Sequence, residues 1–324
     1  MWEERMSTNS NNMGRAYEYA WITALFEMLN PIRNTHIVRN LSFNATEQAW
    51  YAIGQSMRDS FAISANAARD VVLEMEPRME ENDDDTLFLE IQKDRIGESG
   101  DVRDIVIRRD GVEWEVGLSI KHNHTAVKHS RLAHTLDFGS EWYGIPCSNQ
   151  YWQDVRPIFD LLNREKIKGT NWDCLANKDG TIYVPLLQAF LDEVDRVYAN
   201  DPGVAFRMFE YLVGIRDYYK IVSHDSKRVT LIHTFNLHGT LNQPSHVKVS
   251  AIEVPIAEAP RVILGTRFKP GSNTTVEIYM DNGWAFSFRI HSASACVQPS
   301  LKFDVQFIST PESVHNIKCV WNRQ

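Results

Sequence analysis

Residues that could bind a metal ion and activate water gather in one predicted β-hairpin. Its strands, Asp104–Arg108 (DIVIR) and Glu113–Lys121 (EWEVGLSIK), flank Asp110-Gly111, a dipeptide typical of tight turns. Because side chains alternate along a strand, Ser119 and Lys121 are expected to share one face, opposite an apolar face that would enter a core. Oxygen ligands converging on a divalent metal, with a lysine beside them, suit hydrolysis of a phosphate ester.

An aspartate on one strand and an acid-x-lysine on its antiparallel partner form the PD-(D/E)xK nuclease pattern. Asp104 and Lys121 match this pattern, but the residue two before the lysine is Ser119, which is no carboxylate. Glu115 precedes Lys121 by six residues, which is roughly 20 Å along a strand at about 3.3 Å per residue. Glu115 could therefore share a metal with the lysine site only if a bulge intervened.

The second carboxylate therefore has several candidates. A known variant of the pattern has Ser-x-Lys at this position and takes its acid from a following helix, which favours Asp137, with Glu141 a weaker choice. Glu115 and then Glu18, in the first predicted helix, follow Asp137 in order of preference. A two-residue turn would place Asp104 opposite Gly117, but the sequence does not fix that register. We expect Asp104 to ligate the metal, Lys121 to orient or activate water and Ser119 to fill the vacated acid position.

The elements around the hairpin predict an α/β chain. Apolar spacing predicts helices over Arg15–Leu29, Thr46–Met57, Ile63–Met75 and Ala126–Leu136, and a mostly helical stretch over 150–220. Strands are expected at Thr86–Gln92 and, towards the end, at Val229–Leu237, His246–Val254, Thr274–Met280, Ala285–Ser292 and Leu301–Ile308. Together they predict a mixed-sheet nuclease core with flanking helices over 1–150. A helical region over 151–228 would pack on that core, and a β-rich portion over 229–324 would contact DNA.

Composition sets limits without identifying a partner. The 324 residues include 43% hydrophobic and 23% charged side chains, which is typical of a globular protein. The formal charge is −8, but Glu74–Asp85 contains seven acids and one arginine and so carries six of these charges. We expect that stretch to be a solvated loop, which leaves the remainder nearly neutral. Four scattered cysteines, a polar N-terminus and the lack of a long apolar run predict a cytoplasmic protein with free thiols.

Two segments carry a resemblance to a known family. The central block EVGLSIKHNHTAVKHSRLAHTLDFGSEWYGIPCSNQYW and the earlier NMGRAYEYA are similar to the corresponding parts of HaeIII-type restriction endonucleases. The likeness covers most of residues 11–165 and is weaker in the C-terminal third. It implies a Mg²⁺-dependent cut of duplex DNA at GGCC, within a restriction–modification pair that includes a DNA methyltransferase.

Candidate DNA contacts follow from the chemistry of the bases. Arginine suits guanine because its fork spans O6 and N7 in the major groove. The candidates for base contacts are Arg267, Lys269 and Arg289 near the β-rich end, and Arg207 and Arg216 in the helical section. Lys128 and Arg131, on the helix expected after the hairpin, are candidates for phosphate contacts. A palindromic site favours a two-fold arrangement, so we expect a homodimer on DNA.

Two functions of other classes stay open at this point. A sequence-specific DNA-binding protein with a decayed nuclease site would explain the missing carboxylate at Ser119, and metal-dependent cleavage would exclude it. A β-rich module that binds carbohydrate or a small molecule would require a deep aromatic pocket in the C-terminal third. The sequence contains no Walker loop, GxGxxG, GxSxG or HExxH motif that would favour another enzyme class.

Overall fold

The computed structural model describes residues 2–93 and 100–321, with side chains from residue 11 onwards, and divides into two compact units. The first unit comprises Met1–Thr125, Ile215–Ala257 and Glu312–Gln324. The second comprises Ala126–Gly214 and Glu258–Pro311. The chain thus enters and leaves each unit more than once. These two units differ from the three successive regions expected above, 1–150, 151–228 and 229–324. The reason is that strands from distant segments pair in one sheet, which composition along the chain does not reveal.

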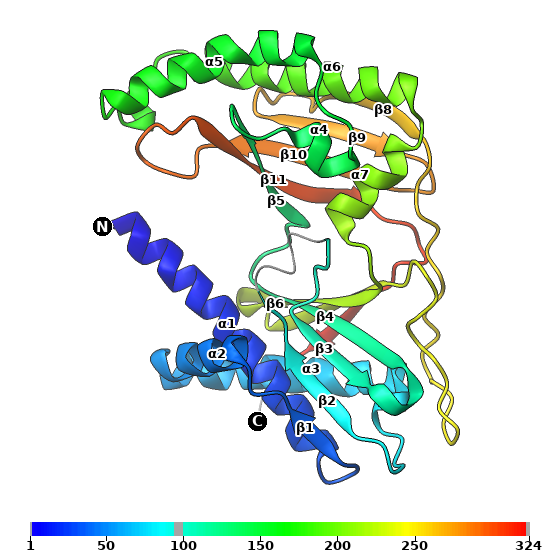
Figure 1. Ribbon diagram of the computed structural model, residues 1–324. Helices are drawn as coiled ribbons and strands as arrows, with labels where there is room; N and C mark the ends of the chain where they lie inside the picture. Colours follow the sequence, from blue (N-terminus) through cyan, green and yellow to red (C-terminus); the bar gives the residue numbers. More distant parts are fainter. Residues whose placement is uncertain (1, 94–99, 322–324) are drawn as a thin grey trace. The chain divides into compact units, whose positions relative to one another are not determined.

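A seven-stranded mixed sheet organises the first unit, in the order β1-β2-β3-β4-β6-β7-β12. The β1–β2 and β4–β6 pairs are parallel and the other pairs are antiparallel. Three helices pack on one face of this sheet (Figure 1). The strands are β1 (Thr35–Ile37), β2 (Leu87–Ile91), β3 (Ile105–Arg109), β4 (Trp114–His122), β6 (Tyr218–His224), β7 (Val229–Phe235) and β12 (Asn316–Val320), and the helices are α1 (Trp2–Leu29), α2 (Leu41–Ala52) and α3 (Gln55–Met75).

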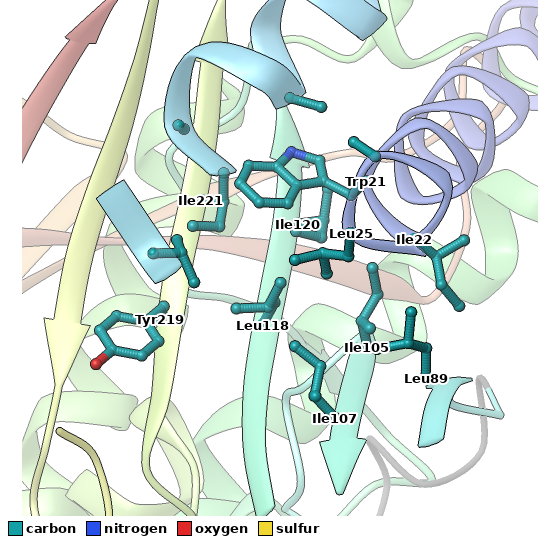
Figure 2. Close-up of a cluster of buried hydrophobic side chains, with 14 of the residues drawn as sticks. Trp21, Ile22, Leu25, Leu89, Ile105, Ile107, Leu118, Ile120, Tyr219 and Ile221 are labelled. Atoms are coloured by element: carbon teal, nitrogen blue, oxygen red, sulfur yellow. The ribbon is translucent and has the colours of Figure 1, made fainter. Parts of the chain in front are cut away.

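Burial of apolar side chains fixes which face of β4 meets the helices. Trp21 and Leu25, one helical turn apart on α1, pack among Leu118 and Ile120 of β4 (Figure 2). Each such side chain stabilises the folded state by on the order of 1.5–3 kcal/mol when it is fully buried. Because side chains alternate, Ser119 and the residues two positions away are left outside this core.

The acidic stretch Glu74–Asp85 is not the solvated loop expected from its composition. Arg33 and Arg109, 3% and 1% exposed, direct their guanidinium groups into it. Arg109 forms an ion pair with Glu81 at 2.5 Å, and Arg33 donates to the Glu81 carbonyl oxygen at 2.6 Å. Two buried cations require nearby acceptors, so the acidic stretch has a structural role as the partner of these two arginines.

The second unit is a five-stranded antiparallel sheet with four helices, its strands in the order β5-β11-β10-β9-β8. Aromatic rings join the helices to the sheet, since Trp142 and Phe190 pack against Phe288 and Phe303. The strands are β5 (Lys128–Ala133), β8 (Ile263–Phe268), β9 (Thr275–Met280), β10 (Ala285–His291) and β11 (Ser300–Ser309), and the helices are α4 (Phe138–Tyr143), α5 (Asn149–Ile167), α6 (Val184–Asn200) and α7 (Val204–Val213).

Most predicted elements are confirmed, and three expectations are wrong. The predicted helix over Ala126–Leu136 is instead strand β5, because its backbone pairs with β11 from 170 residues further along the chain. The predicted strand His246–Val254 is irregular and is held by hydrogen bonds from Asn242 and within its own turns. Strand β6 lies at the end of the helical region expected over 151–228, where it inserts between β4 and β7. In the described part of the chain, no helix is long and apolar enough to span a membrane.

A buried carboxyl joins α3 to the β6–β7 region of the first unit. Glu76 is fully buried and accepts hydrogen bonds from the Tyr219 hydroxyl and the Asn242 N–H, both at 2.6 Å. Burial outweighs these donors and raises the pKa of Glu76 from 4.5 to about 7. The folded protein therefore binds this proton more tightly than the unfolded chain does.

Glu76→Gln should flatten the dependence of stability on pH. With the folded-state pKa above the unfolded one, Glu76 makes the protein less stable as pH rises from about 4.5 to about 7. Glutamine keeps the acceptor without the charge, so the variant should lose about 3 kcal/mol of this dependence. Urea unfolding at pH 5 and pH 8 measures it, with Glu27→Gln, exposed on α1, as control. Equal pH dependence in wild type and the Glu76 variant would contradict the assignment.

Candidate active site

The hairpin turn sets the register of the candidate residues. A 3₁₀ turn, Asp110–Val112, followed by Glu113 in the left-handed conformation joins β3 to β4, so the turn is longer than the two residues considered above. Ile105 consequently pairs with Leu118, and the Asp104 N–H donates to the Leu118 carbonyl oxygen at 2.8 Å. Asp104 therefore stands across from Ser119 rather than Gly117.

One carboxylate oxygen of Asp104 collects the polar groups of β4. Oδ2 accepts from Lys121 Nζ at 2.9 Å, from the Ile120 N–H at 2.6 Å and from the Ser119 hydroxyl at 3.4 Å. Among the described residues, none donates to Oδ1. With its side chain 24% exposed, Asp104 can present that second oxygen to a ligand.

The charge of Lys121 is stabilised by carboxylates from two different elements. Burial lowers the pKa of Lys121, but Asp104 and then Glu18 outweigh it, and the net pKa is raised. Glu18 belongs to α1, where the neighbouring Tyr17 is anchored by its hydroxyl to Ser64 at 2.7 Å. The lysine is therefore a cation held by Asp104 within the field of Glu18.

A small pocket adjoins this group within the first unit. It has a volume of about 180 Å³ and is lined by Arg15 and Glu18 of α1, Ser42 of α2 and Gln92 after β2, among others. The Gln92 N–H donates to the Asp104 carbonyl oxygen at 2.9 Å, which ties the pocket wall to the Asp104 strand. The pocket gives a phosphate oxygen or hydrated cation room beside Glu18.

The donor set fits a hard divalent cation. Carboxylate oxygens of Asp104 and Glu18, with the hydroxyl of Ser119 nearby, are the ligand type that Mg²⁺ prefers. Mg²⁺ also keeps several waters, so two protein carboxylates suffice. The residues present therefore suit Mg²⁺.

The other three carboxylate candidates are engaged elsewhere. Glu115 pairs with Arg103 at 2.9 Å and lies opposite Arg108, four residues along β4 from Ser119, or about 13 Å. Asp137 lies in the second unit and caps α4, accepting from the N–H groups of Ser140 and Cys147 at 3.0 Å. Its burial would raise its pKa, but these N–H donors outweigh burial and lower it. Glu141 accepts from the Tyr211 hydroxyl.

Sequence reasoning missed Lys220, which lies on β6 directly beside Ser119. Its side chain is buried and donates to the Thr125 carbonyl oxygen at 2.9 Å. Burial and the nearby charge of Lys121 lower the pKa of Lys220 to about 7. A lysine inside the apolar run YYKIVSH was the available signal, but it fell in a stretch interpreted as helical. Gln92 at the pocket was also missed.

Five of the candidate DNA contacts lie on or beside the second-unit sheet. Lys128 and Arg131 lie on strand β5 and not on a helix, which corrects the expectation. Lys128 Nζ sits 3.8 Å from the centre of the Tyr211 ring, on the face that carries the helices. Arg131, Arg267 and Arg289 point to the opposite face, and Lys269 follows β8.

Two comparisons with known proteins found a match. A family model described as HaeIII restriction endonuclease matches residues 14–311. The type II restriction enzyme HaeIII of Haemophilus aegyptius is 43% identical over 317 residues, which cover 98% of this chain and 99% of that protein. No solved structure matches the chain significantly.

Gly117→Ala should destabilise the hairpin beside the candidate site. A Cβ at this position would lie 1.9 Å from Arg103 Cδ, so the arginine would have to leave its ion pairs with Asp101 and Glu115. We expect a loss of about 1–3 kcal/mol in the free energy of unfolding, measured in urea. Gly265→Ala in β8, whose Cβ would meet nothing within 4 Å, should change it by less than about 0.5 kcal/mol. Equal effects of the two changes would contradict this packing.

Proposed function

The chain belongs to the HaeIII restriction endonuclease family and is a site-specific deoxyribonuclease, and on that premise we propose that it cuts duplex DNA at GGCC using Mg²⁺. The observation that carries the proposed site is the ion pair of Asp104 and Lys121, which is influenced by the charge of Glu18, a residue that lines a pocket. The GGCC preference is supported by the resemblance to the HaeIII enzyme over almost the whole chain.

Asp104 and Glu18 would hold Mg²⁺, and Lys121 would act on the reacting water. When bound, the ion supplies charge neutralisation at the scissile phosphate and a nucleophile at neutral pH. Lys121, a cation fixed by Asp104 at 2.9 Å, orients the attacking water and stabilises negative charge that develops on phosphate oxygens. Ser119, too short to share a metal as glutamate would, donates its hydroxyl to Asp104 and so holds that carboxylate in place.

The proposed GGCC site is a palindrome, and it has consequences for the oligomeric state and for the cell that makes the enzyme. Two identical subunits related by a two-fold axis match a two-fold symmetric site, so we propose a homodimer on DNA. A cytoplasmic enzyme that cuts GGCC requires a methyltransferase that protects the same sequence in the host.

A binding-only protein with a decayed site is the competing function. Its support was the absence of a carboxylate at Ser119. Glu18 offers a replacement carboxylate from α1, and it acts on the same lysine as Asp104. This arrangement favours cutting over binding alone.

Lys121→Ala should abolish cleavage and leave DNA binding nearly unchanged. The change removes the cation from Asp104 and the water, while the DNA-contacting surface keeps its charges. Wild type should convert plasmid DNA with Mg²⁺, but not with EDTA, into discrete fragments that end within GGCC. The variant should be slower by at least about 10²-fold, judged from the typical effect of an electrostatic catalytic group.

Lys318→Ala, exposed on β12, is the matched control and should cut normally. Wild-type rates from the Lys121 variant would remove this hairpin from the active site. Discrete fragments ending at another sequence would keep the nuclease and refute GGCC.

Glu18→Gln should raise the Mg²⁺ concentration needed for half-maximal cleavage by more than about tenfold, since the loss of one ligand charge weakens a hard-cation site. Glu27→Gln, exposed on the same helix, should leave that concentration unchanged. Asp137→Asn should weaken the cap of α4 and lower stability by about 1 kcal/mol without changing the Mg²⁺ requirement. A shift with Asp137→Asn and none with Glu18→Gln would assign the second ligand to Asp137.

A further inference from the structure

The five-stranded sheet of the second unit has one face packed on helices and one polar face. Phe288 of β10 packs against Trp142 of α4, so its neighbour Arg289 points to the other side. Residues paired across strands share a face, and Arg289 pairs with Asp304 of β11 and Thr275 of β9. We call the side that carries Arg289 the polar face.

Two further rows of side chains extend this polar face. Lys302 of β11 lies between Arg131 of β5 and His291 of β10. Ser287 of β10 lies between Gln306 of β11 and Glu277 of β9, and Arg267 of β8 follows Glu277. Segments separated by more than 150 residues thus bring their basic and amide side chains onto one surface.

The basic side chains outnumber the acids in these rows of the polar face, with Arg131, Arg267, Arg289 and Lys302 against Glu277 and Asp304. Glu277 accepts from Arg267 at 2.9 Å and from the Tyr279 hydroxyl at 2.8 Å. Asp304 accepts from the Gln306 amide at 3.2 Å. Arginines 131 and 289 and Lys302 exceed what these two carboxylates can balance.

Two of these cations are poised for an anionic or acceptor-rich ligand. Burial and then the charge of Arg131 lower the pKa of Lys302. A negative group bound at this surface would therefore stabilise the charged form of Lys302. Arg289 is exposed at the centre of the sheet, and within the described ranges no carboxylate forms an ion pair with it. Its guanidinium fork is therefore available to a pair of acceptors.

We propose that the polar face contacts duplex DNA and that Arg289 donates to a guanine edge of the target site, with Lys302 contacting phosphate. This inference rests on the proposed function, because it assumes a duplex substrate rich in guanine. Sheet strands are an established means of reading DNA grooves, and an arginine fork fits guanine O6 and N7. Lys128, on the helix-packed face, is excluded from this surface.

The test measures binding and cleavage by the full-length chain. Fluorescence anisotropy in EDTA compares a short duplex that carries the sequence at which wild type is found to cut with a scrambled duplex. Arg289→Ala should weaken binding to the target by about tenfold to a hundredfold, and binding to the scrambled duplex by less than about threefold. Arg289→Lys should recover little, because an ammonium cannot replace the fork. Lys302→Ala should weaken both duplexes alike and reduce the salt dependence of binding.

Arg156→Ala, exposed on α5, is the matched control and should change binding to either duplex by less than about twofold. Wild-type affinity in both Arg289 variants would overturn the polar face as the DNA-contacting surface. Equal losses on both duplexes would overturn the guanine contact and reassign Arg289 to phosphate. Preference for single strands would overturn a duplex ligand. The duplex carries the sequence that wild type is found to cut. If the proposed GGCC specificity or the proposed role of Lys121 is wrong, the plasmid digest shows it, and the binding test of the polar face still applies.

Discussion

The alternation of side chains along β4 links the hydrophobic core of the first unit to its candidate chemistry. Leu118 and Ile120 are buried beneath α1, and moving them by one position would bring Ser119 and Lys121 into the core. The register of the hairpin is therefore determined by apolar burial, which contributes several kcal/mol. The polar site inherits that register without having to stabilise it.

The same core positions Glu18, the carboxylate proposed as the second metal ligand. Glu18 lies one turn before Trp21, whose fully buried indole fixes the rotation of α1 above the sheet. Tyr17, also fully buried, holds the same turn through Ser64, which in turn contacts Thr230 of β7 at 2.7 Å. A glutamate supplied by a helix can thus be as well positioned as one on the strand. This explains how a serine is compatible with the acid position of the nuclease pattern.

Sequence reasoning predicted what depends on local pattern and missed what depends on distant pairing. The β3–β4 hairpin and the pair Asp104 and Lys121 could be predicted, because alternation and a turn dipeptide are local signals. Glu18 was ranked behind Asp137 because the Ser-x-Lys variant of the pattern takes its acid from a following helix, whereas Glu18 precedes the hairpin. Strands β5 and β6 were misassigned or missed, since each depends on a partner far away in sequence. Lys220 could not be placed beside Ser119 without that pairing.

A net charge of −8 is compatible with a DNA-cleaving enzyme because the negative charges are locally neutralised. In the acidic stretch, Glu81 and Asp83 pair with the buried guanidinium of Arg109, and Lys248 lies between Glu74 and Glu80. Counterion screening has a length of about 8 Å at physiological salt, so a phosphate responds to nearby surface charge rather than the chain total. Acids that are neutralised by buried arginines contribute little negative charge to the surface. Overall charge therefore says little about nucleic-acid binding until ion pairs have been assigned.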